Sequence, residues 1–187
     1  MAAFRRVVEK SVHDGRIWSV VVAEFEDPDG GSFRRDIVRS PGSVGVVPLS
    51  FDAEGRPTVV LVEQYRPALD RELLEIPAGM RDVPGEAPSE TGRRELLEEA
   101  GLAAGRIEHL VDMVPSPGMS DAVCSIFVAT DCTAVDHDRQ GPEERHMRLV
   151  HLPLDVALAM IDDGRITDGK TICGLLATER RIRREDA

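Results

Sequence analysis

The segment RRELLEEAGL, residues 93–102, places an acidic cluster directly before a glycine. This pattern predicts a helix that ends at Gly101. The last two turns of the helix carry three carboxylates, those of Glu95, Glu98 and Glu99. The backbone dipole is already negative at a helix C-terminus, so each carboxylate there costs a few tenths to about 1 kcal/mol. We therefore expect a positive charge beside this helix that offsets the cost.

The arrangement of the three carboxylates indicates what that charge is. At about 100° per residue, their side chains fall within an arc of roughly 100° and face the same way. Arg94 lies one turn before Glu98 and can pair with it. A solvated acidic face with such a pair is the ordinary alternative. Three clustered carboxylates at the unfavourable helix end instead favour a hard divalent cation such as Mg²⁺, which binds carboxylate oxygens.

Outward from this helix, the sequence predicts strands on both sides and helices at the end. Pro88 and Ser89 supply the start of the acidic helix. Alternating or continuous apolar patterns predict strands at residues 5–12, 16–26, 34–40, 43–51, 58–65, 106–114 and 122–130. Amphipathic patterns predict helices at residues 153–164 and 171–184, and the basic end, residues 180–187, is expected to be solvated and frayed. This order fits a mixed α/β fold, with a small antiparallel sheet in residues 1–41 and the main domain in residues 42–187.

The composition limits the classes of function. The chain has 187 residues, a formal net charge of −11 and a pI near 4.9. Because nucleic-acid binding depends on clustered Lys and Arg, we expect no nucleic-acid partner. No stretch approaches the roughly 18 apolar residues of a membrane span, and the cysteines have no paired spacing that predicts a disulfide framework. We expect a cytoplasmic protein with no membrane partner.

The segment GMRDVPGEAPSETGRRELLEEAGL, residues 79–102, resembles the Nudix box. The pattern of that box is G-x5-E-x7-R-E-U-x-E-E-x-G-U, where U is a bulky aliphatic residue. Eight positions match in register: Glu86, Arg94, Glu95, Leu96, Glu98, Glu99, Gly101 and Leu102. Six residues separate Gly79 from Glu86, where the pattern has five. A loop enlarged by one residue, with its turn at Pro84-Gly85, explains the difference and leaves the helix register unchanged.

Three further segments resemble one Nudix subfamily, the ADP-ribose pyrophosphatases. They are VVLVEQYRPALDRELLEIPAGM (59–80), PSPGMSDA (115–122) and DGRITDGKTICGLL (163–176). The resemblance implies a Nudix-type α/β/α sandwich with a mixed β-sheet, plus the small N-terminal antiparallel sheet. It also implies a Mg²⁺-dependent enzyme, with Mn²⁺ as a possible substitute, that cleaves ADP-ribose to AMP and ribose 5-phosphate.

The same resemblance implies roles for the residues around the acidic helix. Glu95 and Glu99 would be direct metal ligands, supported by Glu98, and the backbone carbonyl of Ala78 could contribute. The position of Ala78 depends on how the enlarged loop is accommodated. Arg94 would orient the glutamates, a role that its spacing from Glu98 also suggests.

Two further groups are candidates for the chemistry of hydrolysis. Arg66 is a candidate phosphate clamp, because a guanidinium fork suits paired phosphate oxygens. A surface arginine in a loop is the alternative for this residue. The resemblance implies that a loop glutamate takes the proton of the attacking water. Glu144 is the preferred candidate for this base, and Glu143 is the alternative. A solvated acidic turn with no catalytic role is the other explanation of this segment.

Candidate substrate contacts lie in the N-terminal part and in the 115–122 segment. Trp18 corresponds to a region where relatives stack an aromatic ring on adenine, often from the partner subunit. Burial in the N-terminal sheet is the alternative and the favoured explanation. The 115–122 segment resembles a substrate-side loop, which makes Ser116, Gly118 and Met119 candidates for substrate binding.

Other substrates and one other class of function stay open. A Nudix hydrolase of GDP-mannose, another nucleotide sugar, FAD or NADH would carry the same box. A domain that senses ADP-ribose without cutting it is the alternative from a different class, and retention of all box glutamates argues against it. The resemblance also implies a homodimer.

Overall fold

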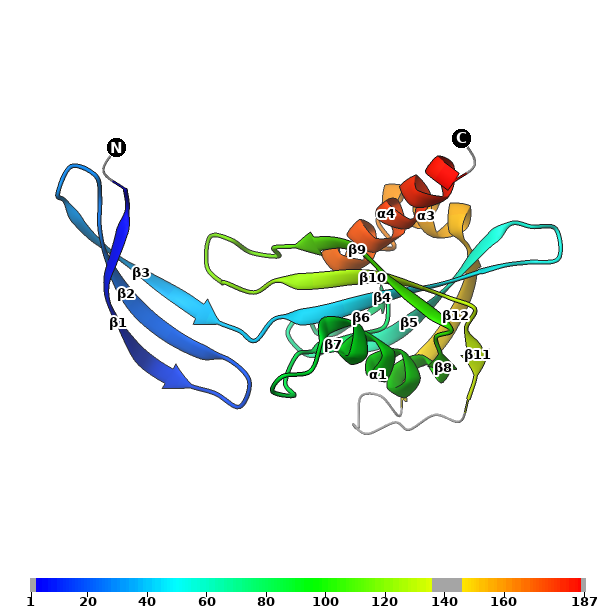
Figure 1. Ribbon diagram of the computed structural model, residues 1–187, viewed down its shortest axis with the longest axis horizontal. Helices are drawn as coiled ribbons and strands as arrows, with labels where there is room; N and C mark the ends of the chain where they lie inside the picture. The colour runs from blue at the N-terminus through cyan, green and yellow to red at the C-terminus, as the bar shows by residue number, and fades with distance from the viewer. Residues whose placement is uncertain (1–2, 136–145, 186–187) are drawn as a thin grey trace. The chain divides into compact units, whose positions relative to one another are not determined.

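The computed structural model describes residues 3–135 and 146–185 (Figure 1). The chain divides into two compact units. The first consists of Met1–Gly42 together with Val114–Val123, and the second of Ser43–Met113 and Cys124–Ala187. The segment that resembles a substrate-side loop therefore belongs to the same unit as the N-terminal strands.

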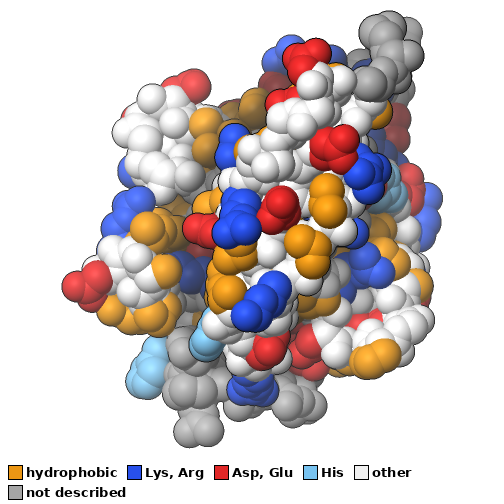
Figure 2. Space-filling view, turned by 90° about the vertical axis from the view of Figure 1, so that its left-hand side faces the viewer, with side chains coloured by type: hydrophobic (Ala, Val, Ile, Leu, Met, Phe, Trp, Pro, Cys, Tyr) orange, Lys and Arg blue, Asp and Glu red, His pale blue; other side chains and the backbone are white. Residues whose placement is uncertain are grey.

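The first unit is built on a three-stranded antiparallel sheet. Its order is β1 (Arg5–Asp14), β2 (Ser19–Glu26) and β3 (Ser32–Arg39), as Figure 1 shows in blue. The predicted antiparallel N-terminal sheet is thus confirmed. All ten residues of the edge strand β1 are exposed, and Figure 2 shows hydrophobic side chains exposed between charged ones.

The predicted burial of Trp18 is wrong. This residue lies in the turn between β1 and β2, where its carbonyl accepts a hydrogen bond of 2.8 Å from the N–H of Gly15. Its surface is 55% exposed. The turn holds the tryptophan backbone but supplies no core for its ring, so an apolar side chain is left in solvent.

The second unit contains a mixed sheet of seven strands. Its order is β12-β5-β4-β10-β9, with β6 paired to β5 and β7 paired to β4. The bounds are β4 (Ser43–Phe51), β5 (Pro57–Arg66), β6 (Arg71–Glu75), β7 (Ala78–Met80), β9 (Arg106–Met113), β10 (Cys124–Thr130) and β12 (Arg148–Pro153). The pair β4–β10 is parallel and the other pairs are antiparallel. A separate two-stranded sheet joins β8 (Leu102–Ala103) to β11 (Thr133–Ala134).

Helices cover both faces of this sheet, as Figure 1 shows. They are α1 (Pro88–Ala100), α3 (Leu154–Asp162) and α4 (Gly169–Glu185). Successive strand residues point to opposite faces, so Val46 packs in the α1 layer and Val47 in the α3–α4 layer. The predicted α/β/α sandwich is confirmed. Among the described residues, no helix has the length and apolar character needed to span a membrane.

The predicted frayed end is wrong for its helical part. Helix α4 continues to Glu185. Ile182 packs against the core beneath it, and Arg181 forms an ion pair of 3.0 Å with Glu108 on β9. Arginine is a good helix former, and its long side chain can keep its charge in solvent while the helix packs, so a basic run does not by itself end a helix.

Candidate active site

Helix α1 begins and ends where the sequence predicts. Pro88 occupies its first turn, and Gly101 adopts a left-handed conformation with φ 62° after the last turn. The N–H of Gly101 is directed to the carbonyls of two leucines in the preceding turn, which closes the helix. The last turn of this fully described helix contains no basic residue. The acidic end of the helix therefore receives no compensating charge from that turn.

Two of the three carboxylates in the last two turns of this helix are buried. Glu95 is 8% exposed and Glu99 is 6% exposed, while Leu96 between them is fully buried and anchors the helix on the sheet. The pKa of Glu95 is raised to about 7 and that of Glu99 to about 8, mainly because burial removes water from the charged form. The negative charge of Glu98 raises the pKa of Glu95 further, and the negative charge of Glu95 raises the pKa of Glu99. A cation at this position would relieve both effects.

Strand β7 packs directly against these carboxylates. Gly79 pairs with Val44 of β4, and a side-chain carbon added at Gly79 would overlap the carboxylate of Glu95. The N–H of Ala78 donates a hydrogen bond of 2.8 Å to Glu99. Gly79 therefore lies against the helix, and the chain turns at Pro84-Gly85, where Gly85 has φ 79°. The observed contact of Ala78 runs through its N–H, whereas the predicted ligand role concerns its carbonyl.

Arg94 connects the acidic groups of the box. Its guanidinium donates a hydrogen bond of 2.7 Å to Glu95 and one of 3.4 Å to Glu98. It also lies 3.3 Å from a carboxylate oxygen of Glu86 and 3.6 Å from one of Asp82. The pairing of Arg94 with Glu98 is thus present as the helical spacing predicts. One guanidinium holds several carboxylates in fixed directions.

Glu86, which matches the box but has no predicted role, also lies in this cluster. Thr91 is fully buried, and its hydroxyl donates a hydrogen bond of 2.7 Å to Glu86. Thr91 and Arg94 together lower the pKa of the Glu86 carboxyl. The match of Glu86 to the Nudix box was the sequence feature that could have indicated its place in this cluster.

Arg66 ends β5 and is held by a buried carboxylate. Its Nε and Nη2 each donate a hydrogen bond of 2.6 Å to Glu75, whose side chain is 1% exposed. Arg66 therefore lies at the end of a strand and not in a loop, and its side chain remains 38% exposed. The segment around Glu75 carries the subfamily resemblance, but its sequence did not reveal this partner.

The candidate substrate residues Ser116, Gly118 and Met119 lie in the first unit. The N–H of Met119 donates a hydrogen bond of 3.1 Å to Ser116, and the carbonyl of Met119 accepts one of 2.8 Å from Val38 on β3. A hollow of about 460 Å³ in this unit is lined by Gly118 and Met119 together with nine other residues. Among them are two stacked phenyl rings with centroids 5.3 Å apart, those of Phe25 and Phe33.

The sequence pattern does not single out these two rings, because aromatic residues in strands usually indicate a core. Trp18, which it did single out, does not line this hollow. The candidate bases Glu143 and Glu144 lie outside the described residues.

The residues around α1 fit a hard divalent cation. The available donors are carboxylate oxygens, without sulfur or imidazole, and two of them are buried with raised pKa values. Within residues 3–135 and 146–185, no three acidic, histidine or cysteine side chains already converge on one point. Arg94 engages Glu95 and Glu98 instead, and the N–H of Ala78 engages Glu99. A cation would compete with these contacts for the same oxygens.

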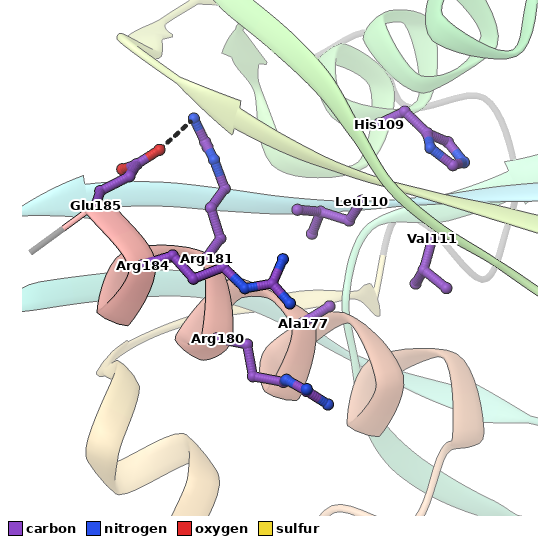
Figure 3. Close-up of a pocket in the computed structure, with 8 residues that line it drawn as sticks. All are labelled: His109, Leu110, Val111, Ala177, Arg180, Arg181, Arg184 and Glu185. Atoms are coloured by element: carbon purple, nitrogen blue, oxygen red, sulfur yellow. Dashed lines mark ion pairs between the residues drawn. The ribbon is translucent and has the colours of Figure 1, made fainter. Parts of the chain in front are cut away.

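A second hollow lies between β9 and α4 (Figure 3). Its volume is about 590 Å³, and three arginines of α4 line it: Arg180, Arg181 and Arg184. Helix α4 covers the face of the sheet opposite to α1. This basic hollow is therefore separate from the acidic cluster.

The buried carboxylates predict how stability depends on pH in the absence of metal. Both folded-state pKa values lie above the ordinary value of 4.5, so the folded protein binds more protons than the unfolded chain between pH 4.5 and about 8. The free energy of unfolding should therefore fall as pH rises through this range. We expect the melting temperature in EDTA to fall by roughly 5 °C between pH 5 and 8.5.

A variant with Gln at both Glu95 and Glu99 is the control, because it lacks the two titrating groups. Its melting temperature should change less over the same pH range. The melting temperatures are measured by calorimetry. An equal dependence on pH in the two proteins would show that these carboxylates do not cause the loss of stability at high pH.

Comparison with known proteins identifies the class. The NUDIX domain family matches residues 40–173, which include β4, β7, the acidic helix and the start of α4. The chain belongs to this family.

Relatives with established names cover most of the chain. A methanol dehydrogenase activator of Bacillus methanolicus is 34% identical, over 90% of this chain and 88% of its own length. An ADP-ribose pyrophosphatase of Mycobacterium tuberculosis is 34% identical, over 93% and 82%. A GDP-mannose pyrophosphatase of Pectobacterium atrosepticum is 38% identical, over 89% of each chain. A solved structure of an ADP compounds hydrolase matches with a TM-score of 0.83 at 20% identity, covering 98% of this chain and 96% of that chain, which shows a shared fold.

Proposed function

We propose that the protein is a Mg²⁺-dependent hydrolase that cleaves ADP-ribose to AMP and ribose 5-phosphate. The observation that carries this proposal is the pair of buried carboxylates on α1, Glu95 and Glu99, packed against the backbone of β7. The relative named ADP-ribose pyrophosphatase supports the substrate. Mn²⁺ is proposed as a substitute metal, since it also accepts oxygen donors.

Each residue of the acidic cluster has a proposed role. Glu95 and Glu99 hold the metal, with the carbonyl of Ala78 as a further donor. Glu98 supports them, and Arg94 fixes the direction of the glutamates through the hydrogen bonds described above. When bound, divalent ions neutralise the pyrophosphate and lower the pKa of a bound water.

The remaining steps belong to the chain. Glu144, or Glu143 in its place, accepts the proton of the attacking water. The oxygen of that water forms a bond to one phosphorus while the bond from this phosphorus to the bridging oxygen breaks. Arg66 binds the phosphate oxygens and stabilises their negative charge. The positive charge that the reaction needs thus comes from the metal and a few arginines, although the protein is acidic overall.

Substrate recognition is proposed for the first unit. Ser116, Gly118 and Met119 contact the substrate from the loop beside β3, and Trp18 offers an exposed aromatic ring for stacking on the base. Solvent exposure of the Trp18 ring supports this role, because stacking on a ligand would bury it.

A panel of substrates tests the proposal. Purified protein is incubated with ADP-ribose, GDP-mannose, FAD and NADH in Mg²⁺ and ¹⁸O-labelled water, and the products are identified by mass spectrometry. AMP and ribose 5-phosphate formed fastest from ADP-ribose support the proposal. Faster cleavage of GDP-mannose would favour the second candidate, which the relative from Pectobacterium atrosepticum supports. Calorimetric binding of ADP-ribose without AMP release would indicate a sensing domain.

We further propose that the protein is a cytoplasmic homodimer. The support is β1, an edge strand that exposes Val7, Val8 and Val12. Exposed apolar side chains on an edge strand favour pairing with another chain. Light scattering during gel filtration should give twice the monomer mass of 20.5 kDa. A Val8→Glu/Val12→Glu variant should shift the mass towards the monomer, and a monomeric wild-type protein would refute the proposal.

A further inference from the structure

A cluster of polar side chains joins β5, β6 and the start of α4. Its members are Arg66, Glu75, Asp168, Lys170 and Thr171. Glu75 is central, because it accepts two hydrogen bonds from Arg66 and forms an ion pair with Lys170. Lys170 also donates a hydrogen bond of 3.0 Å to Asp168. The chain thus brings together residues about a hundred positions apart in its sequence.

Hydrogen bonds of the next residue, Thr171, hold the turn that carries Lys170. The neighbouring Thr171 is fully buried, and its hydroxyl donates a hydrogen bond of 2.6 Å to Asp168. The same hydroxyl accepts a hydrogen bond of 2.9 Å from the N–H of Ile76, the residue after Glu75. The first turn of α4 is therefore tied to the chain directly after β6.

Stability alone does not account for such a cluster. A buried carboxylate between two cations loses its hydration, and replacing buried ion groups by apolar side chains of similar size is often neutral or stabilising. What the cluster does achieve is a fixed direction for each charged group. The long side chains of Arg66 and Lys170 have the most rotamer freedom to lose.

The hydrogen bonds of Arg66 use one edge of its guanidinium. Nε and Nη2 both donate to Glu75. Among the described residues, Glu75 is the only one that hydrogen-bonds to this side chain, which is 38% exposed. Both hydrogens of Nη1 and one of Nη2 remain for another acceptor. The free edge can therefore bind two phosphate oxygens.

This cluster also lies beside the acidic site. Glu75, which holds Arg66, is followed three residues later by Ala78, whose N–H donates a hydrogen bond of 2.8 Å to Glu99 on α1. The segment that joins β6 to β7 therefore connects the cluster to the buried carboxylate of α1.

We propose that Glu75 and Lys170 are positioning residues, which hold the guanidinium of Arg66 so that its Nη1 edge faces the diphosphate of the substrate. Lys170 acts through Glu75, because it holds the carboxylate that Arg66 binds. This inference rests on the proposed hydrolysis of a nucleoside diphosphate derivative. It adds two residues, from β6 and α4, to the substrate site.

A double-mutant cycle tests whether Lys170 acts through Arg66. The variants are Lys170→Met, Arg66→Met and the combination, and kcat and KM are measured for the best substrate of the panel per folded molecule. We expect Lys170→Met to lower kcat/KM about tenfold, mainly through KM, in the wild-type background. In the Arg66→Met background it should have no further effect, since its target is absent. Equal losses in both backgrounds would overturn the proposal.

Two further variants separate positioning from a general effect on the helix. Lys170→Arg keeps the charge and should restore most of the activity lost in Lys170→Met. Arg181→Met removes a different cation of helix α4, one that pairs with Glu108 and with Glu185, and it should leave kcat/KM unchanged. Figure 3 shows Arg181 and its ion pair with Glu185. A loss in Arg181→Met equal to that in Lys170→Met would contradict the proposal. If Lys170→Met does not fold, Glu75→Gln replaces it in the cycle with the same expectations.

A measurement without substrate distinguishes failure of this inference from failure of the proposed function. In ¹⁵N-arginine NMR spectra, the Nε–H of Arg66 should exchange slowly with water in the wild-type protein. The signal should be lost by exchange in Lys170→Met and in Glu75→Gln, and kept in Arg181→Met. Undiminished protection in Lys170→Met would overturn the positioning role. Protection that is lost as expected, in a protein that cleaves no substrate of the panel, would instead refute only the proposed function.

Discussion

Glu99→Gln is expected to lower kcat by about 100- to 1000-fold, because loss of this proposed metal ligand would remove several kcal/mol of transition-state stabilisation. The glutamine keeps a carbonyl oxygen that can accept the hydrogen bond from Ala78. It also removes a buried carboxyl whose pKa is raised to about 8 because burial disfavours its charged form, so above this pH the metal-free protein should unfold at the same or a higher temperature. Activity and stability therefore change in opposite directions. Steady-state kinetics and calorimetry in EDTA measure the two effects.

The matched control lies on the same helix. Glu90 is in the first turn of α1 with its side chain 62% exposed, and Glu90→Gln should leave kcat within about twofold. Magnesium titration gives a further check, since Glu99→Gln should bind the ion at least tenfold more weakly. Turnover of Glu99→Gln at the wild-type rate in saturating Mg²⁺ would remove Glu99 from the metal site.

Gly79→Ala is expected to lower kcat/KM by about 100-fold while the protein stays folded. The added carbon would overlap the carboxylate of Glu95, which must then move. A displacement of about 1 Å in an active site can cost this much activity. The carboxylate of Glu95 is at the end of a flexible side chain, so it can move without a shift of the backbone. The melting temperature should therefore change little. A large loss of stability with unchanged kcat/KM would contradict this account.

Gly169→Ala is the control for this substitution. An added carbon at Gly169 meets no atom within 4 Å, and its backbone does not have a positive φ. The same chemical change should therefore leave activity intact. A crystal structure of Gly79→Ala should show Glu95 rotated away from β7.

The acidic helix could be predicted from the sequence because its signals are local. Pro88 and Gly101 mark its ends, and the spacing of the carboxylates fixes which side chains share a face. The main strands follow from runs of β-branched residues, as in β5. Short-range physical preferences determine these elements, and the fold class follows from their order.

Features that depend on distant contacts could not be predicted. Strands β6 and β7 are too short for a periodic pattern, and β7 is defined only by its pairing with β4. Arg66 binds Glu75 on β6, and Glu75 in turn binds Lys170 on α4. Lys170 lies 95 positions beyond Glu75 in the sequence. The exposure of Trp18 depends on which side chains surround its turn. Each of these results is a property of the packed chain.

The longer loop of the box shows which changes of length this region can absorb. The chain is fixed before the loop by the pairing of Gly79 with β4, and after it by the contacts of Glu86 with Thr91 and Arg94. Between these anchors, Gly85 turns the chain with φ 79°. Asp82, at the start of the loop, lies 3.6 Å from Arg94 and so belongs to the acidic cluster. The exposed turn at residues 83–85 is free of that contact, so it is the suitable place to graft a peptide tag or a fluorescent label.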